Sequence, residues 1–197
     1  MERLVSIDSL KIVPHDRRSL AALGMTWGVT LFQLISKNRA YLKKFLPWLD
    51  FCKSTEDSHE FIRKTTIENN ENTALTLCIR KAHQIIGVIC FHAFDHSSKS
   101  AGIGYWLDND HQGKGIITLA CENLIQYGFN DLNFAEIKIS CGTANIKSMA
   151  VPERLGFVRK KIIPQKEWLY DHYVDHCCYE MTAEEWSTLK LSHSMSI

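Results

Sequence analysis

The sequence predicts an α/β fold, because strand-like and helix-like apolar patterns alternate along its 197 residues. Apolar residues recur at helical spacing from Ile117 to Phe129, which indicates a helix with one packed face. Apolar segments at 74–80, 85–94 and 101–107 are separated by turn-forming residues, which indicates a meander of strands.

The remaining elements are expected in chain order. They are a strand at 10–13, one or two helices at 16–37, a helix at 56–70 with Phe61 and Ile62 on its buried side, a strand at 135–141, a helix after Asn145, and strands at 157–168 and 173–181. Turns are expected at 81–84, at 95–98 and at Tyr170-Asp171-His172. The length fits a single domain, placed at residues 1–186, with a Ser-rich tail at 187–197 that we expect to fray.

The segment from Gln112 to Thr118 joins a strand to the helix that follows it. Its glycines, Gly113 and Gly115, allow a tight turn and close approach to a ligand, and Lys114 adds a positive charge. The first amides of a helix lack intrahelical partners and carry partial positive charge, so we predict a cradle for a pyrophosphate. The alternative is an ordinary Gly-rich turn. The spacing excludes a Walker loop and fits a dinucleotide fingerprint poorly.

A second segment, from Asn145 to Phe157, has the signals of a short helix. Asn145 is a good N-cap, and Gly156 suits the left-handed residue that ends the helix. Pro152 lacks an N–H group and cannot donate a hydrogen bond to the carbonyl of Ser148, four residues earlier. We therefore expect the helix to be distorted at Ser148.

Together with Tyr105-Trp106-Leu107, these two segments resemble the GNAT superfamily of acetyl-CoA-dependent N-acetyltransferases. Gln112 and Gly115 match its Gln/Arg-x-x-Gly-x-Gly/Ala coenzyme A loop, in which Ile117 replaces the last small residue, and Asn145 begins its Asn-x-x-Ser helix. The resemblance covers most of the chain and is greatest to the ribosomal-protein-serine/alanine N-acetyltransferase group. It implies a mixed, mostly antiparallel central sheet flanked by helices and splayed at the acetyl-CoA site.

The resemblance also implies roles for individual residues. Backbone amides near Trp106 and Leu107 would form an oxyanion hole, Asn145 would hold the pantetheine arm, and Ser148 would protonate the leaving thiolate. The expected acetyl-CoA contacts are Trp106, Leu107, Gln112, Gly113, Lys114, Gly115, Ile116, Ile117, Asn145 and Ser148. Without the resemblance, a solvated hydroxyl in the first turn of a helix would be the better explanation of Ser148.

The acceptor side is expected to hold a base and a pocket. A peptide α-amine has a pKa of about 7.7–8.0, so a modest base suffices, and Glu167 matches a functional glutamate of the same group. Its alternative role is a salt bridge with Lys166 or another neighbour. Tyr41, Trp48 and Trp106 would line the acceptor pocket, although large aromatic residues are more often core. Asp175 would instead bind the incoming amine.

Composition limits the possible functions. A net charge of +1 gives no electrostatic footprint for nucleic acid. The seven cysteines, the absence of a long apolar run and the lack of a signal-peptide pattern predict a cytoplasmic protein with reduced thiols that does not bind membranes. His172 and His176 would lie too far apart in one strand to share a metal ion, so we expect no metal site.

Three functions fit these observations. The first is an enzyme that transfers the acetyl group of acetyl-CoA directly, in a ternary complex, to the N-terminal amine of a protein, plausibly a ribosomal protein. The second has a small amine as acceptor, such as a polyamine, an aminoglycoside or an amino acid derivative. The third is a non-catalytic acyl-CoA-binding module. The aromatic N-terminal region suits either a pocket or a homodimer contact.

Overall fold

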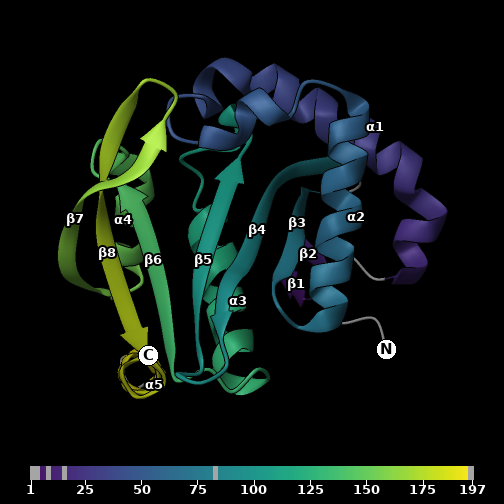
Figure 1. Ribbon diagram of the computed structural model, residues 1–197. Helices are drawn as coiled ribbons and strands as arrows, with labels where there is room; N and C mark the ends of the chain where they lie inside the picture. Colours follow the sequence, from purple (N-terminus) through teal and green to yellow (C-terminus); the bar gives the residue numbers. More distant parts are fainter. Residues whose placement is uncertain (1–4, 8–9, 15–16, 82–83, 195–197) are drawn as a thin grey trace.

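The computed structural model describes residues 5–7, 10–14, 17–81 and 84–194 (Figure 1). Its elements are β1 (Val5–Ile7), β2 (Leu10–Pro14), α1 (Arg17–Leu42), the 3-10 helix η1 (Pro47–Phe51), α2 (Thr55–Glu71), β3 (Leu75–Lys81), β4 (Gln84–Asp95), β5 (Ser100–Leu107), the 3-10 helix η2 (Asn109–His111), α3 (Ile116–Asn130), β6 (Glu136–Gly142), α4 (Ile146–Arg154), β7 (Val158–Leu169), β8 (His172–Thr182) and α5 (Ala183–Ser194). None of the helices in these ranges is long and apolar enough to span a bilayer.

The strands form one eight-stranded sheet in the order β1-β2-β3-β4-β5-β6-β8-β7. Every neighbouring pair is antiparallel except β5 and β6, which are parallel. Their pairing runs from Ser100 opposite Glu136 to Ile103 opposite Ile139 and then ends. Beyond Ile103 and Ile139 the two strands diverge and form a splay between β5 and β6 (Figure 1). The predicted mixed, mostly antiparallel and splayed sheet is confirmed.

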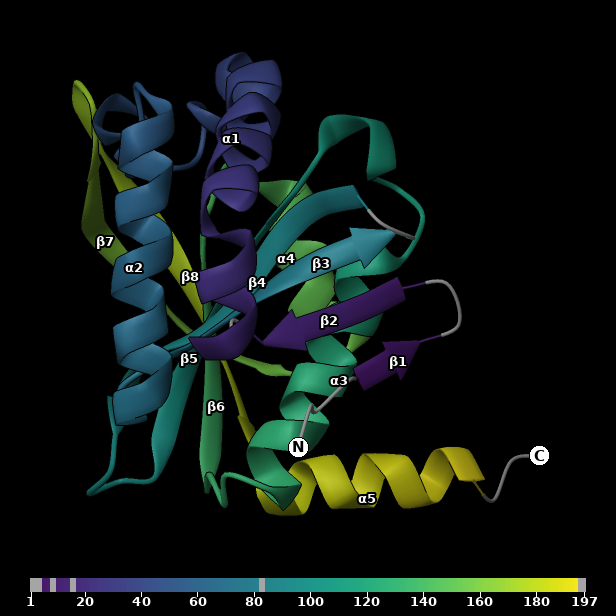
Figure 2. The ribbon, with the colours of Figure 1, turned by 90° about the vertical axis from the view of Figure 1, so that its right-hand side faces the viewer.

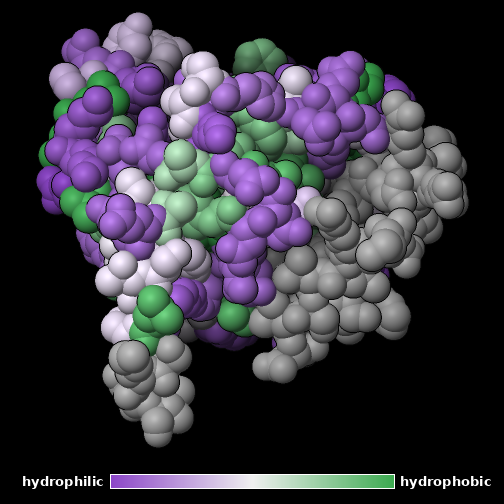
Figure 3. Space-filling view, turned by 90° about the horizontal axis from the view of Figure 1, so that it is seen from below, coloured by the Kyte–Doolittle hydropathy of each residue, from purple (hydrophilic) through white to green (hydrophobic). Residues whose placement is uncertain are grey.

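Helices cover both faces of the sheet. Helices α1 and α2 lie on one face, over β3 and β4, whereas α3, α4 and α5 lie on the other (Figures 1 and 2). Each side has its own apolar cluster, and strand alternation divides β4 between them: Ile89 packs with the α3 side and Val88 with the α1 side. The end opposite the splay is mainly hydrophilic around a central apolar area (Figure 3).

One local expectation, the burial of Phe61, is wrong. Ile62 of α2 is 4% exposed, but Phe61 is 40% exposed, because the buried face of α2 also contains Ser58 and Thr65, and this spacing turns position 61 away. In the tail, residues 187–194 belong to α5, which runs from Ala183 to Ser194.

A capping pattern that precedes the tail explains this helix. The Thr182 hydroxyl accepts a hydrogen bond from the Glu185 amide, and the Glu185 carboxylate accepts one from the Thr182 amide. Trp186 is buried and Leu189 packs against the core. Other boundaries agree within a few residues, although α1 is one helix that extends to Leu42. Asp16, the turn residues Ala82 and His83, and the last three residues of the tail lie outside the described residues.

Candidate functional site

The cradle has the predicted backbone conformation. Gly113 and Gly115 have φ values of 71° and 74°, in the left-handed region that favours glycine. A Cβ atom added to either glycine would meet no atom within 4 Å, so neither glycine is required by internal packing. Gly115 is the N-cap of α3 and has no side chain to bond the amides of the first turn. These amides and the helix dipole can therefore bind an anion.

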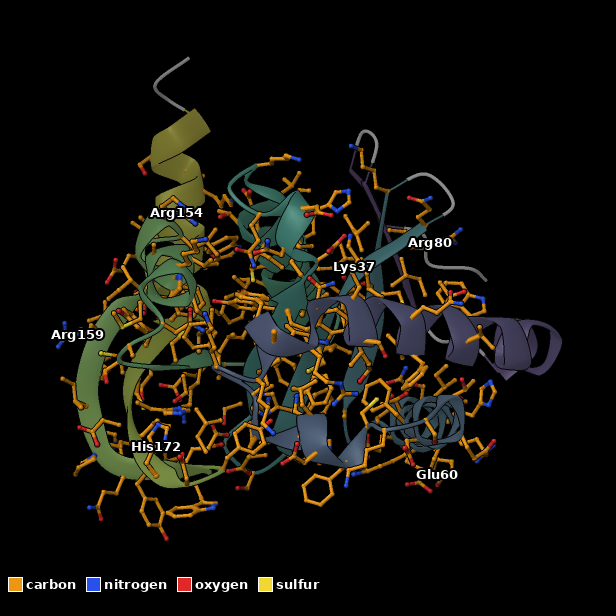
Figure 4. The ribbon with its side chains drawn as sticks, turned by 90° about the horizontal axis from the view of Figure 1, so that it is seen from above. Lys37, Glu60, Arg80, Arg154, Arg159 and His172 are labelled. Atoms are coloured by element: carbon orange, nitrogen blue, oxygen red, sulfur yellow. The ribbon has the colours of Figure 1, made fainter. Side chains whose placement is uncertain are left out.

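A buried carboxylate that sequence reasoning missed anchors the loop before the cradle. Asp108 is 3% exposed. It accepts hydrogen bonds from Asn38 Nδ2 and Lys37 Nζ, both at 2.9 Å, and lies 3.1 Å from His111 Nδ1. Burial raises the pKa of Asp108, but these hydrogen bonds outweigh it and bring the pKa below its ordinary value. The network ties the loop to α1, from which Lys37 extends (Figure 4).

Gln112 connects the cradle to two helices. Its Oε1 accepts a hydrogen bond from Lys147 Nζ of α4 at 3.2 Å. Burial raises the pKa of Tyr41 in α1, and a hydrogen bond with Gln112 partly opposes the shift. Lys114, in contrast, is exposed and donates to the Asp110 carbonyl at 2.9 Å.

Ser148 lies in a polar cluster on the α4 face of the sheet. Asn145 caps α4, because its Oδ1 accepts a hydrogen bond from Ser148 N at 3.2 Å. The Ser148 hydroxyl donates to the Tyr105 hydroxyl at 3.1 Å and lies 3.2 Å from Cys141 Sγ. Ser148 is half-buried rather than solvated. The helix α4 continues through Pro152, so Pro152 does not end it, and the Ser148 carbonyl accepts a hydrogen bond from Tyr105 at 2.9 Å.

Glu167 lies in a second polar cluster, on the α1 face. Its Oε2 is 3.4 Å from His176 Nε2, and His176 Nδ1 is 3.0 Å from Ser140 Oγ. The Glu167 side chain is 34% exposed and that of His176 is 13% exposed. The side chain that Glu167 contacts is thus His176 on the neighbouring strand, which sequence reasoning considered only as a metal ligand. In the described part of the chain, no group of three or more His, Cys, Asp or Glu residues is arranged to hold a metal ion.

The two clusters meet at adjacent residues of β6. Ser140 bonds His176 on one face, and Cys141 contacts Ser148 on the other, as the alternation of side chains along a strand requires. This part of β6 lies beyond Ile139, where its pairing with β5 has ended. A Cβ atom at the next residue, Gly142, would meet no atom within 4 Å. A group placed in the splay would therefore have a hydroxyl on one side and a carboxylate on the other.

The backbone of β5 also borders this gap. Asp108 N donates to Ile86 O in β4 at 2.7 Å. Because successive peptide groups point to opposite sides of a strand, the Trp106 amide also points toward β4, and the Leu107 amide points toward the gap. Of the two expected oxyanion-hole residues, Leu107 is therefore the one whose amide would face a group bound between β5 and β6.

The expected acceptor residues are only partly brought together. Tyr41, Trp48 and Trp106 pack in one cluster on the α1 face, and the rings of Trp48 and Trp106 are 6.4 Å apart. Alternation along β8 places Asp175 on the face opposite His176, and its Oδ1 accepts a hydrogen bond from Gln165 N at 2.8 Å. Asp175 therefore stabilises the irregular part of β7 instead of joining Glu167.

The hairpin formed by β7 and β8 is attached to the aromatic cluster. Tyr170, at its tip, donates a hydrogen bond to Leu46 O at 2.6 Å, and Lys43 Nζ lies 4.3 Å from the centre of the Tyr170 ring. The hairpin tip and the α1–η1 connection consequently lie side by side at the same end of the molecule (Figures 1 and 4).

Comparisons with known proteins agree with this geometry. Residues 29–158 match the family model described as acetyltransferase (GNAT) domain. The ribosomal-protein-serine acetyltransferase of Escherichia coli (strain K12) is 36% identical over 145 residues, which are 74% of this chain and 81% of that protein.

Two solved structures extend the comparison. The ribosomal L7/L12 alpha-N-protein acetyltransferase RimL in complex with coenzyme A is 25% identical, with a TM-score of 0.85 over 93% of this chain and 99% of that chain. The microcin C7 self immunity acetyltransferase MccE in complex with acetyl-CoA and AMP is 31% identical, with a TM-score of 0.80 over 89% of this chain and 93% of that chain.

Proposed function

This chain belongs to the GNAT acetyltransferase family and is an acetyl-CoA-dependent N-acetyltransferase. We propose that its acceptor is the N-terminal α-amine of a ribosomal protein. One observation carries the proposed mechanism. Ser148 and Glu167 are connected to neighbouring residues of β6 but lie on opposite faces of the sheet, where β5 and β6 diverge.

The cradle and the splay suit the two ends of acetyl-CoA. The amides of residues 113–117 hold the diphosphate, Asn145 holds the pantetheine arm, and the acetyl thioester enters the gap between β5 and β6. The Leu107 amide stabilises the negative charge that develops on the carbonyl oxygen, an effect on the order of 3 kcal/mol for one such donor.

Each of the two polar clusters then carries out one proton transfer, on its own face of the sheet. On the α1 face, Glu167 takes a proton from the attacking amine, and His176 holds its carboxylate in place. On the α4 face, Ser148 donates a proton to the departing thiolate, and the serine oxygen takes a proton back from solvent. Because both reactants are bound at once, transfer is direct and needs no acetylated side chain.

The acceptor assignment rests on the two ribosomal acetyltransferase relatives and on the ion pairs of acidic residues near α1 and α2. Both ribosomal acetyltransferase relatives act on ribosomal proteins, as their names state. A polyamine would require a cluster of carboxylates. Acids near α1 and α2, such as Asp50 and Glu60, are instead paired with Lys43 and Arg63.

Steady-state kinetics test the mechanism. Ser148→Ala and Glu167→Gln should each lower kcat by about 10²–10⁴-fold and leave the Kd for coenzyme A nearly unchanged. Ser187→Ala and Glu184→Gln, which change exposed residues of α5, serve as matched controls and should retain full activity. Wild-type kcat in both site variants would refute the proposed roles.

A panel of acceptors tests the substrate class. It contains peptides with N-terminal Ser or Ala, the same peptides with a blocked N-terminus and an internal lysine, a polyamine and an aminoglycoside. Free thiol release and the mass of the product should show acetylation at the free N-termini alone. The second candidate is a small-molecule amine, because the MccE relative was solved with AMP, and acetylation of only the small amines would favour it.

A further inference from the structure

The Ser148 carbonyl lacks the partner that it would have in an ordinary helix. In α4, the residue four positions later is Pro152, which has no N–H group to donate. An unpaired carbonyl at a half-buried position is costly, so another donor is needed. That donor is the Tyr105 hydroxyl on β5, at 2.9 Å from Ser148 O.

The same Tyr105 oxygen also receives the Ser148 hydroxyl proton, at 3.1 Å. A phenol has one proton to donate, and Tyr105 uses it on the carbonyl, so its oxygen is left to accept from Ser148 Oγ. Burial raises the pKa of Tyr105, which keeps the phenol protonated and suited to this double role. Ser148 Oγ is also in contact with Cys141 Sγ at 3.2 Å, and Cys141 contacts the Tyr105 hydroxyl too.

These contacts fix the serine at both its backbone and its side chain. The carbonyl bond holds the first turn of α4 against β5, and the hydroxyl bond selects one side-chain rotamer and so fixes the position of Ser148 Oγ. A hydroxyl has one proton, so the O–H bond must turn about the Cβ–Oγ axis, from Tyr105 to the thiolate, before Ser148 acts as a proton donor. The second bond has no structural necessity, because a serine hydroxyl in a first turn can bond water instead.

We propose that Tyr105 is a positioning residue for Ser148, and that Pro152 creates this role by leaving the Ser148 carbonyl free for the Tyr105 hydroxyl. The inference rests on the proposed function, in which Ser148 is the proton donor. Without the Tyr105 hydroxyl, Ser148 would stay in the first turn of α4, but its side chain would adopt several rotamers at the edge of the splay.

Tyr105→Phe tests the proposal. It should lower kcat about 10–100-fold and change the KM for acetyl-CoA by less than about twofold, since a misplaced catalytic group affects the chemical step. In a Ser148→Ala background, Tyr105→Phe should cause no further loss of kcat, because the two residues act as one unit. Tyr179→Phe is the matched control: Tyr179 is also buried and its hydroxyl also bonds α4, but at Glu153. It should lower the melting temperature and leave kcat intact.

Pro152→Ala separates positioning from structural support. Pro152→Ala supplies the missing N–H group. The double variant with Tyr105→Phe and Pro152→Ala should therefore have the melting temperature of Pro152→Ala alone. The kcat should stay low, because the Ser148 hydroxyl still lacks its partner. Recovery of kcat together with stability would overturn the proposal.

The kinetics also distinguish failure of this proposal from failure of the proposed function. If Ser148→Ala lowers kcat and Tyr105→Phe does not, or if the two losses multiply, the positioning role is overturned and the proton donor stands. If Ser148→Ala leaves kcat unchanged, the donor role is overturned and the positioning role falls with it.

Discussion

Replacement of Gly115 by alanine tests the cradle most simply. Gly115 has a φ of 74°, and an alanine in this left-handed region costs about 1–2 kcal/mol. A Cβ atom at this position would meet no atom within 4 Å, so no clash adds to that cost. Gly115→Ala should therefore destabilise the protein by about 1–2 kcal/mol and leave the fold intact.

The effect on ligand binding should be separate from this strain. Backbone strain is present in both the free and the bound protein, so by itself it does not change the Kd. The new methyl group, however, occupies the open side of the cradle, where the diphosphate must approach the amides. We expect the Kd for coenzyme A to rise at least about tenfold, which corresponds to about 1.4 kcal/mol.

Calorimetric titration with coenzyme A and thermal melts of the free protein measure the two effects. Gly156→Ala is the matched control, because Gly156 has a φ of 79° at the end of α4, and its Cβ would lie 2.8 Å from Leu189 Cδ1, the end of a flexible side chain. The control should lose at least as much stability and keep its Kd. An unchanged Kd in Gly115→Ala, beside the expected loss of stability, would refute a diphosphate site at this turn.

Three further changes probe the surroundings of the site. Asp108→Asn should destabilise the protein by about 1–3 kcal/mol at neutral pH, as measured by urea unfolding. The folded pKa of Asp108 lies below its unfolded value, so its contribution to the free energy of unfolding is present above the unfolded pKa and is lost as the pH falls through the folded pKa. The stability of the variant should therefore depend less on pH on the acid side. An unchanged pH profile would contradict this. Tyr170→Phe removes the hydrogen bond to Leu46 and should raise the KM for a peptide acceptor without altering the Kd for coenzyme A; an unchanged KM would separate the hairpin from acceptor binding. His176→Leu should lower kcat by releasing Glu167, and His176→Gln, which retains a donor, should recover part of it; equal rates in both variants would argue against the contact.

The fold was predictable wherever a local signal decided it. The glycine pattern of the cradle, the Asn145 cap and the apolar periodicity of α3 each specify backbone conformation within a few residues, and all three are confirmed. The helix α5 had such a signal too, in Thr182 and Glu185, but the Ser-rich composition after it suggested a frayed tail.

The contacts of the site depend on tertiary structure and were only partly predictable. Asp108 follows a buried strand, but its partners Lys37 and Asn38 lie about 70 residues earlier, so no spacing rule connects them. The pairing of Glu167 with His176 depends on the register of β7 and β8, which an irregularity between Ile163 and Glu167 shifts. The position of Pro152 predicted that the Ser148 carbonyl would lack its usual helical partner. The residue that donates a hydrogen bond to this carbonyl, Tyr105, lies on β5.

A crystal structure of the protein with coenzyme A tests the central claim most directly. The account predicts diphosphate oxygens about 3 Å from amide nitrogens of residues 113–117, with the thiol between β5 and β6 and within hydrogen-bond reach of Ser148 Oγ. A diphosphate bound away from the start of α3, or a thiol that lies outside the gap, would contradict it.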